Sequence, residues 1–200
     1  MSTRVDSDEH SLELHLPYIY HIFSVYHEQE KHPPLVPILV GNTSPSVERA
    51  FGAILAPYLA DPDNVFVISS DFCHWGSRFS YTYYLPSATS DSAEGVSLKS
   101  RDKPRDPPVY ESIARIDQLA MESVESGQHD AFLATLRDTG NTVCGRHPIG
   151  VMMAAIGVLK SEGKIDQDKG RFNFVRYERS SDVHDGSDSS VSYASAFAIL

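Results

Sequence analysis

Four residues able to do chemistry lie close together in the chain: Asp71, Cys73, His74 and Trp75, the last being the only tryptophan. Asp71 and His74 could form a proton-transfer pair in which the carboxylate orients the imidazole, or both could face a metal ion. They could equally have local roles, Asp71 as a turn cap and His74 in a nearby hydrogen bond. The residue types alone leave these alternatives open.

Cys144 starts a second candidate segment, Cys144-Gly145-Arg146-His147-Pro148. It directly precedes a predicted helix and is close to Arg146, and both features favour the thiolate, the form that attacks electrophiles and binds metals. A structural cysteine near a helix start is the alternative interpretation. The spacing of Cys144 and His147 is a weak motif by itself.

A third group of titratable residues lies near the N-terminus, where Glu9, His10, Glu13 and His15 occur within a short stretch. The favoured interpretation is an acidic helix start, with Glu9 interacting with the helix dipole and His15 on a solvated face. The chain has no glycine-rich phosphate loop, no Gly-x-Ser-x-Gly elbow and no His-Glu-x-x-His helix.

The segment that precedes Asp71 and His74 in the sequence has the pattern of a βαβ unit, which would position both residues. Residues 35–40 and 64–68 are apolar, β-branched runs typical of buried parallel strands. Ser44-Pro45 between them is a typical helix start. Since open parallel sheets bind ligands beyond the carboxyl ends of their strands, Asp71 and His74 should face such a crevice.

The other elements follow from apolar periodicity and from glycine and proline positions. We expect a helix over residues 11–28, either kinked at Pro17 or beginning there, and a buried helix after Pro148. The remaining predictions are helices at 109–126 and 129–138, ending near Gly127 and Gly140, strands at 172–177 and 191–200, a flexible insert at 86–108, and a solvated acidic loop at 180–190.

Composition limits the class of protein. A chain of 200 residues with 41% hydrophobic and 22% charged residues suits one globular domain, residues 1–200. The formal net charge of -10 disfavours nucleic acid and anionic lipid as partners. No apolar run reaches the roughly 18 to 20 residues that span a bilayer, and the N-terminus lacks a signal-peptide segment, so we expect a cytoplasmic protein, also present in the nucleus, with free thiols.

Several segments in a fixed order closely resemble the Memo family, whose name refers to receptor-tyrosine-kinase-driven cell motility. The set is specific, and it spans nearly the whole chain outside the insert. Its segments are Glu9-His10-Ser11-Leu12-Glu13-Leu14-His15-Leu16-Pro17-Tyr18, Val40-Gly41, Ser69-Ser70-Asp71-Phe72-Cys73-His74-Trp75-Gly76, Asn141-Thr142-Val143-Cys144-Gly145-Arg146-His147-Pro148-Ile149-Gly150 and Ser189-Ser190-Val191-Ser192-Tyr193-Ala194.

The resemblance implies a fold and a site. The fold would be α/β, with a mixed, largely parallel sheet flanked by helices, similar to class III extradiol dioxygenases. Cys144 matches a thiol ligand of copper or iron, and Asp71 and His74 match residues beside the metal, with His74 as acid or base. Arg146, His147 and Trp75 would contact a bound ligand, and the activity would be that of an oxidoreductase linked to motility and cytoskeletal signalling.

One departure from the family concerns the metal ligands. Members carry an Ala-Pro-His-Ala-Gly turn and a Gly-Pro-Ser-His-His turn that supply two histidine ligands, and neither motif occurs here. We therefore expect a chain that is truncated at its N-terminus and holds metal weakly through Cys144. Sheet edges left uncovered would favour self-association.

Two other functions stay open from the sequence. The same pocket could bind a phosphotyrosine peptide or signalling protein without catalysis, and Arg146 would then meet the anionic group. A nucleophilic enzyme using Cys144 and His74 is the weaker alternative, because no oxyanion hole is evident.

Overall fold

The structure is a computed structural model of the 200-residue chain and describes residues 3, 9–28, 31–86 and 95–200. By the contacts between residues, the chain divides into two units, residues 1–42 and 43–200. Each unit is described by itself below. None of the helices among the described residues is long and apolar enough to cross a lipid bilayer.

The first unit contains the predicted N-terminal helix. A short 3-10 turn, η1 (Glu13–His15), leads directly into α2 (Leu16–Tyr26). The Glu9 carboxylate accepts hydrogen bonds from the amides of Ser11 and Leu12 at 2.8 and 2.9 Å. Pro17 lies in the first turn of α2, where a missing amide donor costs nothing. The acidic helix start is thus confirmed, and the helix begins beside Pro17 rather than kinking there.

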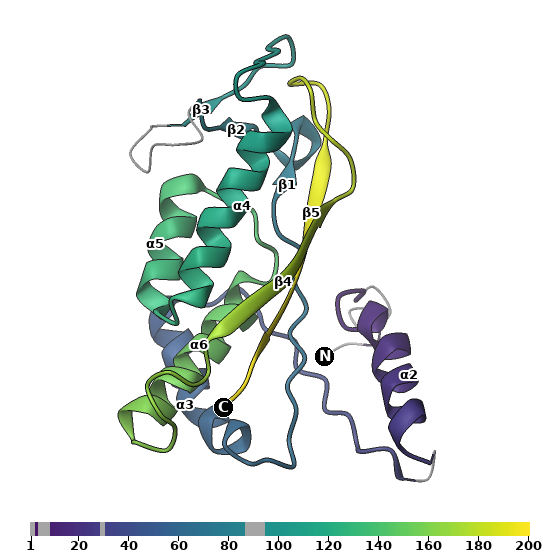
Figure 1. Ribbon diagram of the computed structural model, residues 1–200, viewed down its shortest axis with the longest axis vertical. Helices are drawn as coiled ribbons and strands as arrows, with labels where there is room; N and C mark the ends of the chain where they lie inside the picture. Colours follow the sequence, from purple (N-terminus) through teal and green to yellow (C-terminus); the bar gives the residue numbers. More distant parts are fainter. Residues whose placement is uncertain (1–2, 4–8, 29–30, 87–94) are drawn as a thin grey trace. The chain divides into compact units, whose positions relative to one another are not determined.

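The second unit is built from helices and two small antiparallel sheets (Figure 1). Its α-helices, within the described residues, are α3 (Pro45–Leu59), α4 (Val109–Glu125), α5 (His129–Thr139) and α6 (Arg146–Ser161). The predicted helices at 109–126 and 129–138 are confirmed as α4 and α5, and the buried helix around Pro148 is confirmed as α6.

Helix α3 packs closely against α6. The Ser44 hydroxyl accepts a hydrogen bond from the amide of Val47 at 3.4 Å, and Pro45 is the first helical residue, as the sequence predicted. A Cβ atom on Gly52 would lie 2.7 Å from the Cβ of Ala154, so glycine is required for this approach of the two helices.

The strands pair only in antiparallel fashion within the described residues. The larger sheet has the order β1-β5-β4, and a long β4–β5 hairpin dominates it (Figure 1). A second, two-stranded sheet joins β2 and β3. The strands are β1 (His74–Trp75), β2 (Tyr83–Tyr84), β3 (Val96–Ser97), β4 (Phe172–Arg179) and β5 (Ser190–Ala198). The two C-terminal strands predicted from the sequence are therefore confirmed.

The predicted βαβ unit with a largely parallel sheet is not confirmed. Its helix is α3, but residues 35–40 and 64–68 form no strand in the described structure. A β-branched run favours extended backbone, whereas a strand also needs a neighbour to hydrogen-bond with. Val65 and Val67 are instead 83% and 54% exposed. The similarity in fold to the dioxygenases stays a prediction.

The two segments predicted to be loops contribute to the core. Residues 87–94 of the predicted insert lie outside the described residues, but Val96 and Ser97 form β3 and Leu98 packs against the buried cluster around Ile113. In the acidic loop at 180–190, Val183 is fully buried in that same cluster, and its carbonyl accepts from the amide of Tyr110 at 3.1 Å. The expectation of a flexible insert and a solvated loop is wrong at these positions.

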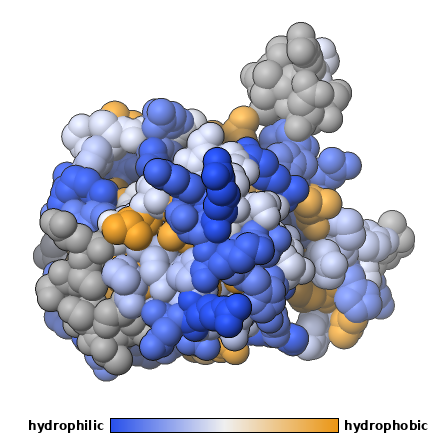
Figure 2. Space-filling model, turned by 90° about the horizontal axis from the view of Figure 1, so that it is seen from above, coloured by the Kyte–Doolittle hydropathy of each residue, from blue (hydrophilic) through white to orange (hydrophobic). Residues whose placement is uncertain are grey.

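Hydrophobic side chains also reach the surface of the second unit. Figure 2, which draws the whole chain, shows hydrophobic residues in several separate places among hydrophilic ones. On α3 the exposed members follow the period of a helix, because they recur every three or four residues. They are Val47, Phe51, Ile54 and Tyr58.

Candidate metal-binding site

Two chain segments lie side by side at the candidate site, one leading into β1 and the other into α6. The amide of Cys144 donates a hydrogen bond to the carbonyl of Asp71 at 3.2 Å. The Thr142 hydroxyl accepts from the amide of His74 at 2.7 Å and donates to the carbonyl of the same residue at 3.1 Å. These bonds hold Asp71 and His74 against the segment that carries Cys144.

Close packing on both sides keeps the first segment in place. A Cβ atom on Gly145 would lie 2.3 Å from the Cβ of Ser70, so glycine permits this contact. The Gly145 amide donates to the Ser70 hydroxyl at 3.0 Å. On the opposite side, Ser192 of β5 accepts from the amide of Phe72 and donates to the carbonyl of Cys73, both at 2.9 Å.

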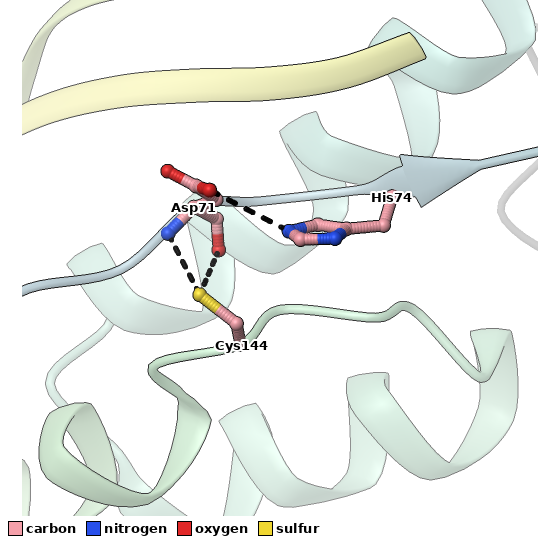
Figure 3. Close-up of side chains that lie close together, drawn as sticks. All are labelled: Asp71, His74 and Cys144. Atoms are coloured by element: carbon pink, nitrogen blue, oxygen red, sulfur yellow. Dashed lines mark hydrogen bonds and ion pairs between the residues drawn. The ribbon is translucent and has the colours of Figure 1, made fainter. Parts of the chain in front are cut away.

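Asp71, His74 and Cys144 form a cluster of metal-ligand types (Figure 3). One ligand atom from each lies within 4.8 Å of the others, and no other such group of three occurs among the described residues. The Asp71 amide donates to the Cys144 sulfur at 3.0 Å. His74 Nε2 and Asp71 Oδ2 are 3.7 Å apart, too far for a hydrogen bond. Asp71 therefore makes no direct hydrogen bond to the His74 imidazole in this structure, and its role in orienting that ring stays a prediction.

The chemistry of this donor set fits iron or copper. Nε2 of His74 is buried and has no hydrogen-bond partner within the described structure. A buried polar atom in that state is costly, and here it points towards Asp71 (Figure 3). The ring is held edge-on against Phe79, with centroids 5.2 Å apart. A soft thiolate with an imidazole and a carboxylate is a suitable donor set for either metal.

The two cysteines should differ sharply in reactivity. Cys144 is exposed, whereas Cys73 is fully buried. Burial, reinforced by the neighbouring Asp117, raises the pKa of the Cys73 thiol well above its ordinary value. We expect iodoacetamide at neutral pH to label Cys144 and leave Cys73 unmodified until the protein unfolds, as measured by peptide mass spectrometry. Equal labelling of both thiols in the folded protein would contradict this assignment.

Trp75 was expected to contact a ligand, but the structure places its side chain in the core, and a ligand contact stays a prediction. Its side chain has no exposed surface and belongs to the buried cluster with Val109, Ile113 and Val183. The indole Nε1 donates to the carbonyl of Tyr83 at 2.8 Å. Side chains alternate along β1, so the chain that presents His74 to the site turns Trp75 into the core.

His147 is not among the three clustered residues and belongs to a separate polar network. Its Nδ1 is 2.7 Å from one oxygen of Glu48, and Nε2 of His129 is 2.6 Å from the other. Glu48 is only 1% exposed, so this network joins α3, α5 and α6 in the interior. Arg146 is exposed and its Nε donates to Nε2 of His147 at 3.2 Å. The predicted ligand role of His147 is not supported by this placement.

Sequence reasoning missed residues that shape the site without being ligands. Thr142 and Gly145 are within two residues of Cys144 in the sequence, so the sequence could have indicated that they lie close to it. Glu48 gave no such signal, because it is distant in sequence from both histidines that it contacts.

Fold and site together define a class of protein. It is an α/β protein of helices and small antiparallel sheets, in which aspartate, histidine and cysteine side chains from two adjoining segments cluster in the way that metal ligands do. The chain belongs to the Memo family, since the family model described as Memo-like protein matches residues 1–197.

Individual proteins of the same family are similar to this chain in sequence. Protein MEMO1 of Danio rerio is 42% identical over 200 residues, covering 100% of this chain and 59% of the relative. Protein MEMO1 of Homo sapiens is 40% identical over 194 residues, covering 97% of this chain and 57% of the relative. A MEMO1 family protein of Schizosaccharomyces pombe is 38% identical over 199 residues, covering 99% of this chain and 62% of the relative. The chain thus spans 57% to 62% of the length of these relatives.

Proposed function

We propose that this Memo-family protein binds a redox-active metal ion, iron or copper, at Asp71, His74 and Cys144 and acts as an oxidoreductase. The observation that carries the proposal is the clustering of these three donors, with Nε2 of His74 buried and lacking a hydrogen-bond partner in the described structure. A metal ion would bind that nitrogen together with the exposed sulfur of Cys144.

Each residue has a distinct role in this proposal. Cys144 supplies the thiolate, and the carboxylate of Asp71 supplies negative charge that favours a cation. His74 supplies Nε2, which either binds the ion or holds a proton beside it, while Thr142 fixes the backbone of His74 through two hydrogen bonds. Bound iron or copper would contribute one-electron redox chemistry.

The test is an anaerobic titration of the reduced protein with Fe(II) and with Cu(I), counting bound metal. We expect one ion per chain in the wild type, and Cys144→Ser should weaken binding by more than about 100-fold, since losing a ligand costs more than losing one of its supporting contacts. Cys73→Ala is the matched control and should bind like the wild type. Metal binding that survives Cys144→Ser would exclude the proposed site.

A second candidate function is recognition of an anionic peptide, such as a phosphotyrosine peptide, without catalysis. Arg146 favours it, because this exposed guanidinium directly follows the site segment and can pair with a phosphate or carboxylate. A wild type that binds neither metal would leave this candidate in place. We also propose a role in cell motility, a cytoplasmic or nuclear location, and self-association. The first follows from the resemblance to the Memo family, and the other two follow from the sequence.

A further inference from the structure

A fully buried carboxylate on α4, Asp117, contacts both segments that form the candidate site. Its Oδ1 accepts hydrogen bonds from the amide of Cys73 at 3.1 Å and from Nδ2 of Asn141 at 2.9 Å. Its Oδ2 accepts from the hydroxyl of Tyr177 on β4 at 2.8 Å. The side chain has no exposed surface.

The two donors to Oδ1 are close to the proposed ligands. The amide of Cys73 directly precedes His74, and Asn141 directly precedes Thr142, whose hydroxyl binds the backbone of His74. A single oxygen atom therefore links the segment of His74 to the segment of Cys144, in addition to the direct hydrogen bonds between the two segments. Tyr177, which donates to Oδ2, comes from a strand that carries none of the proposed ligands, and its hydroxyl also lies 3.1 Å from the hydroxyl of Ser192.

The burial of Asp117 makes this arrangement sensitive to its donors. Desolvation raises the pKa of the Asp117 carboxyl, and hydrogen bonds from Asn141, Ser192, Tyr177 and the Cys73 amide oppose that rise. A buried carboxylate is tolerated only while its hydrogen bonds are made. The position of the two segments and the orientation of the carboxylate thus depend on each other.

We propose that Asp117 is a positioning residue that sets the distance between the Cys144 sulfur and the side chains of Asp71 and His74. It touches no metal itself and acts through Cys73 and Asn141. This inference rests on the proposed metal-binding function, and it adds the residue that keeps the donor set assembled.

The test compares two variants that each remove one hydrogen bond from the same carboxylate. Asn141→Ala removes the hydrogen bond between Asp117 and the Cys144 segment, and Tyr177→Phe removes the hydrogen bond between Asp117 and β4. We expect Asn141→Ala to weaken Co(II) binding by about 10- to 100-fold and to reduce the thiolate-to-Co(II) charge-transfer absorption. Tyr177→Phe should leave both unchanged even where the two variants are equally destabilised.

Two further variants sharpen the comparison. Asp117→Asn retains an oxygen that can accept from both segments, so it should restore the Co(II) binding that Asp117→Ala loses. Asn141→Ser, whose hydroxyl is too short to reach Asp117, replaces Asn141→Ala if the latter does not fold, with the same expected result. The inference would be overturned if Asn141→Ala and Tyr177→Phe weakened Co(II) binding equally. It would also be overturned if neither Asn141→Ala nor Asn141→Ser weakened Co(II) binding.

A metal-free measurement separates this inference from the proposed function. If wild-type protein binds none of Fe(II), Cu(I) and Co(II), the proposed function fails, and amide hydrogen exchange decides the positioning role. Asn141→Ala should then speed exchange at the amides of His74 and Cys144, which bond to Thr142 and Asp71, and Tyr177→Phe should not. Equal exchange in the two variants would overturn the positioning role.

Discussion

Replacing Glu48 by alanine is expected to lower the free energy of unfolding by about 3 to 5 kcal/mol, because it removes a buried side chain together with its hydrogen bonds to two imidazoles. The carboxylate is buried and contacts His129 and His147 through separate oxygens. Its removal leaves Nε2 of His129 without its partner and Nδ1 of His147 with only the Thr43 hydroxyl at 3.1 Å, and it opens a cavity between three helices. Urea denaturation followed by circular dichroism measures the change.

Glu48→Gln is the matched control, because it keeps the volume and one acceptor oxygen. It should cost clearly less than the alanine variant. Metal binding at Asp71, His74 and Cys144 should persist in folded Glu48→Gln, since Glu48 contacts none of these side chains in the described structure. A loss of less than about 1 kcal/mol in Glu48→Ala would mean that the network is solvated like a surface ion pair.

Replacing Trp75 by alanine should be similarly damaging, with a loss of about 3 to 5 kcal/mol in the free energy of unfolding. The indole is fully buried, and its Nε1 donates to the carbonyl of Tyr83. The variant therefore creates a large cavity and leaves that carbonyl without its donor. Such a loss is a large share of the roughly 5 to 15 kcal/mol that stabilises a typical domain.

Trp75→Phe separates the two contributions, because it restores most of the apolar volume but not the hydrogen bond. Its unfolding free energy should lie between those of the alanine variant and the wild type, as measured by chemical denaturation. If Trp75→Ala were as stable as the wild type yet lost ligand binding, the original prediction of a ligand contact would be right and the buried placement wrong.

The helices could be predicted from the sequence because their signals are local. Ser44 and Pro45 start α3 where their chemistry requires, and the glycines after α4 and α5 follow the last helical turns. Strand pairing depends on residues far apart in sequence, so the run at 64–68 indicated extended backbone without indicating a partner. For the same reason, the loop residue Val183 gave no sign that it would be buried.

The candidate site was predictable in its ligands and not in its supporting residues. Asp71 and His74 stood out by their types, and their association with Cys144 came from the resemblance. His147 contacts Glu48, which the sequence could not indicate, because proximity in sequence to Cys144 does not fix which way a helical side chain points. Asp117 could not be found from the sequence, since an isolated aspartate in an amphipathic helix usually faces solvent.

The single tryptophan adjoins His74 in the chain, and the two residues share strand β1. Its indole is enclosed by apolar side chains, so its fluorescence in the folded protein should be blue-shifted relative to that of the unfolded chain. Any ion or small molecule that moves the backbone of β1 also moves this fluorophore. The protein therefore carries an intrinsic optical probe beside its candidate site, and occupancy can be followed in unlabelled wild-type protein.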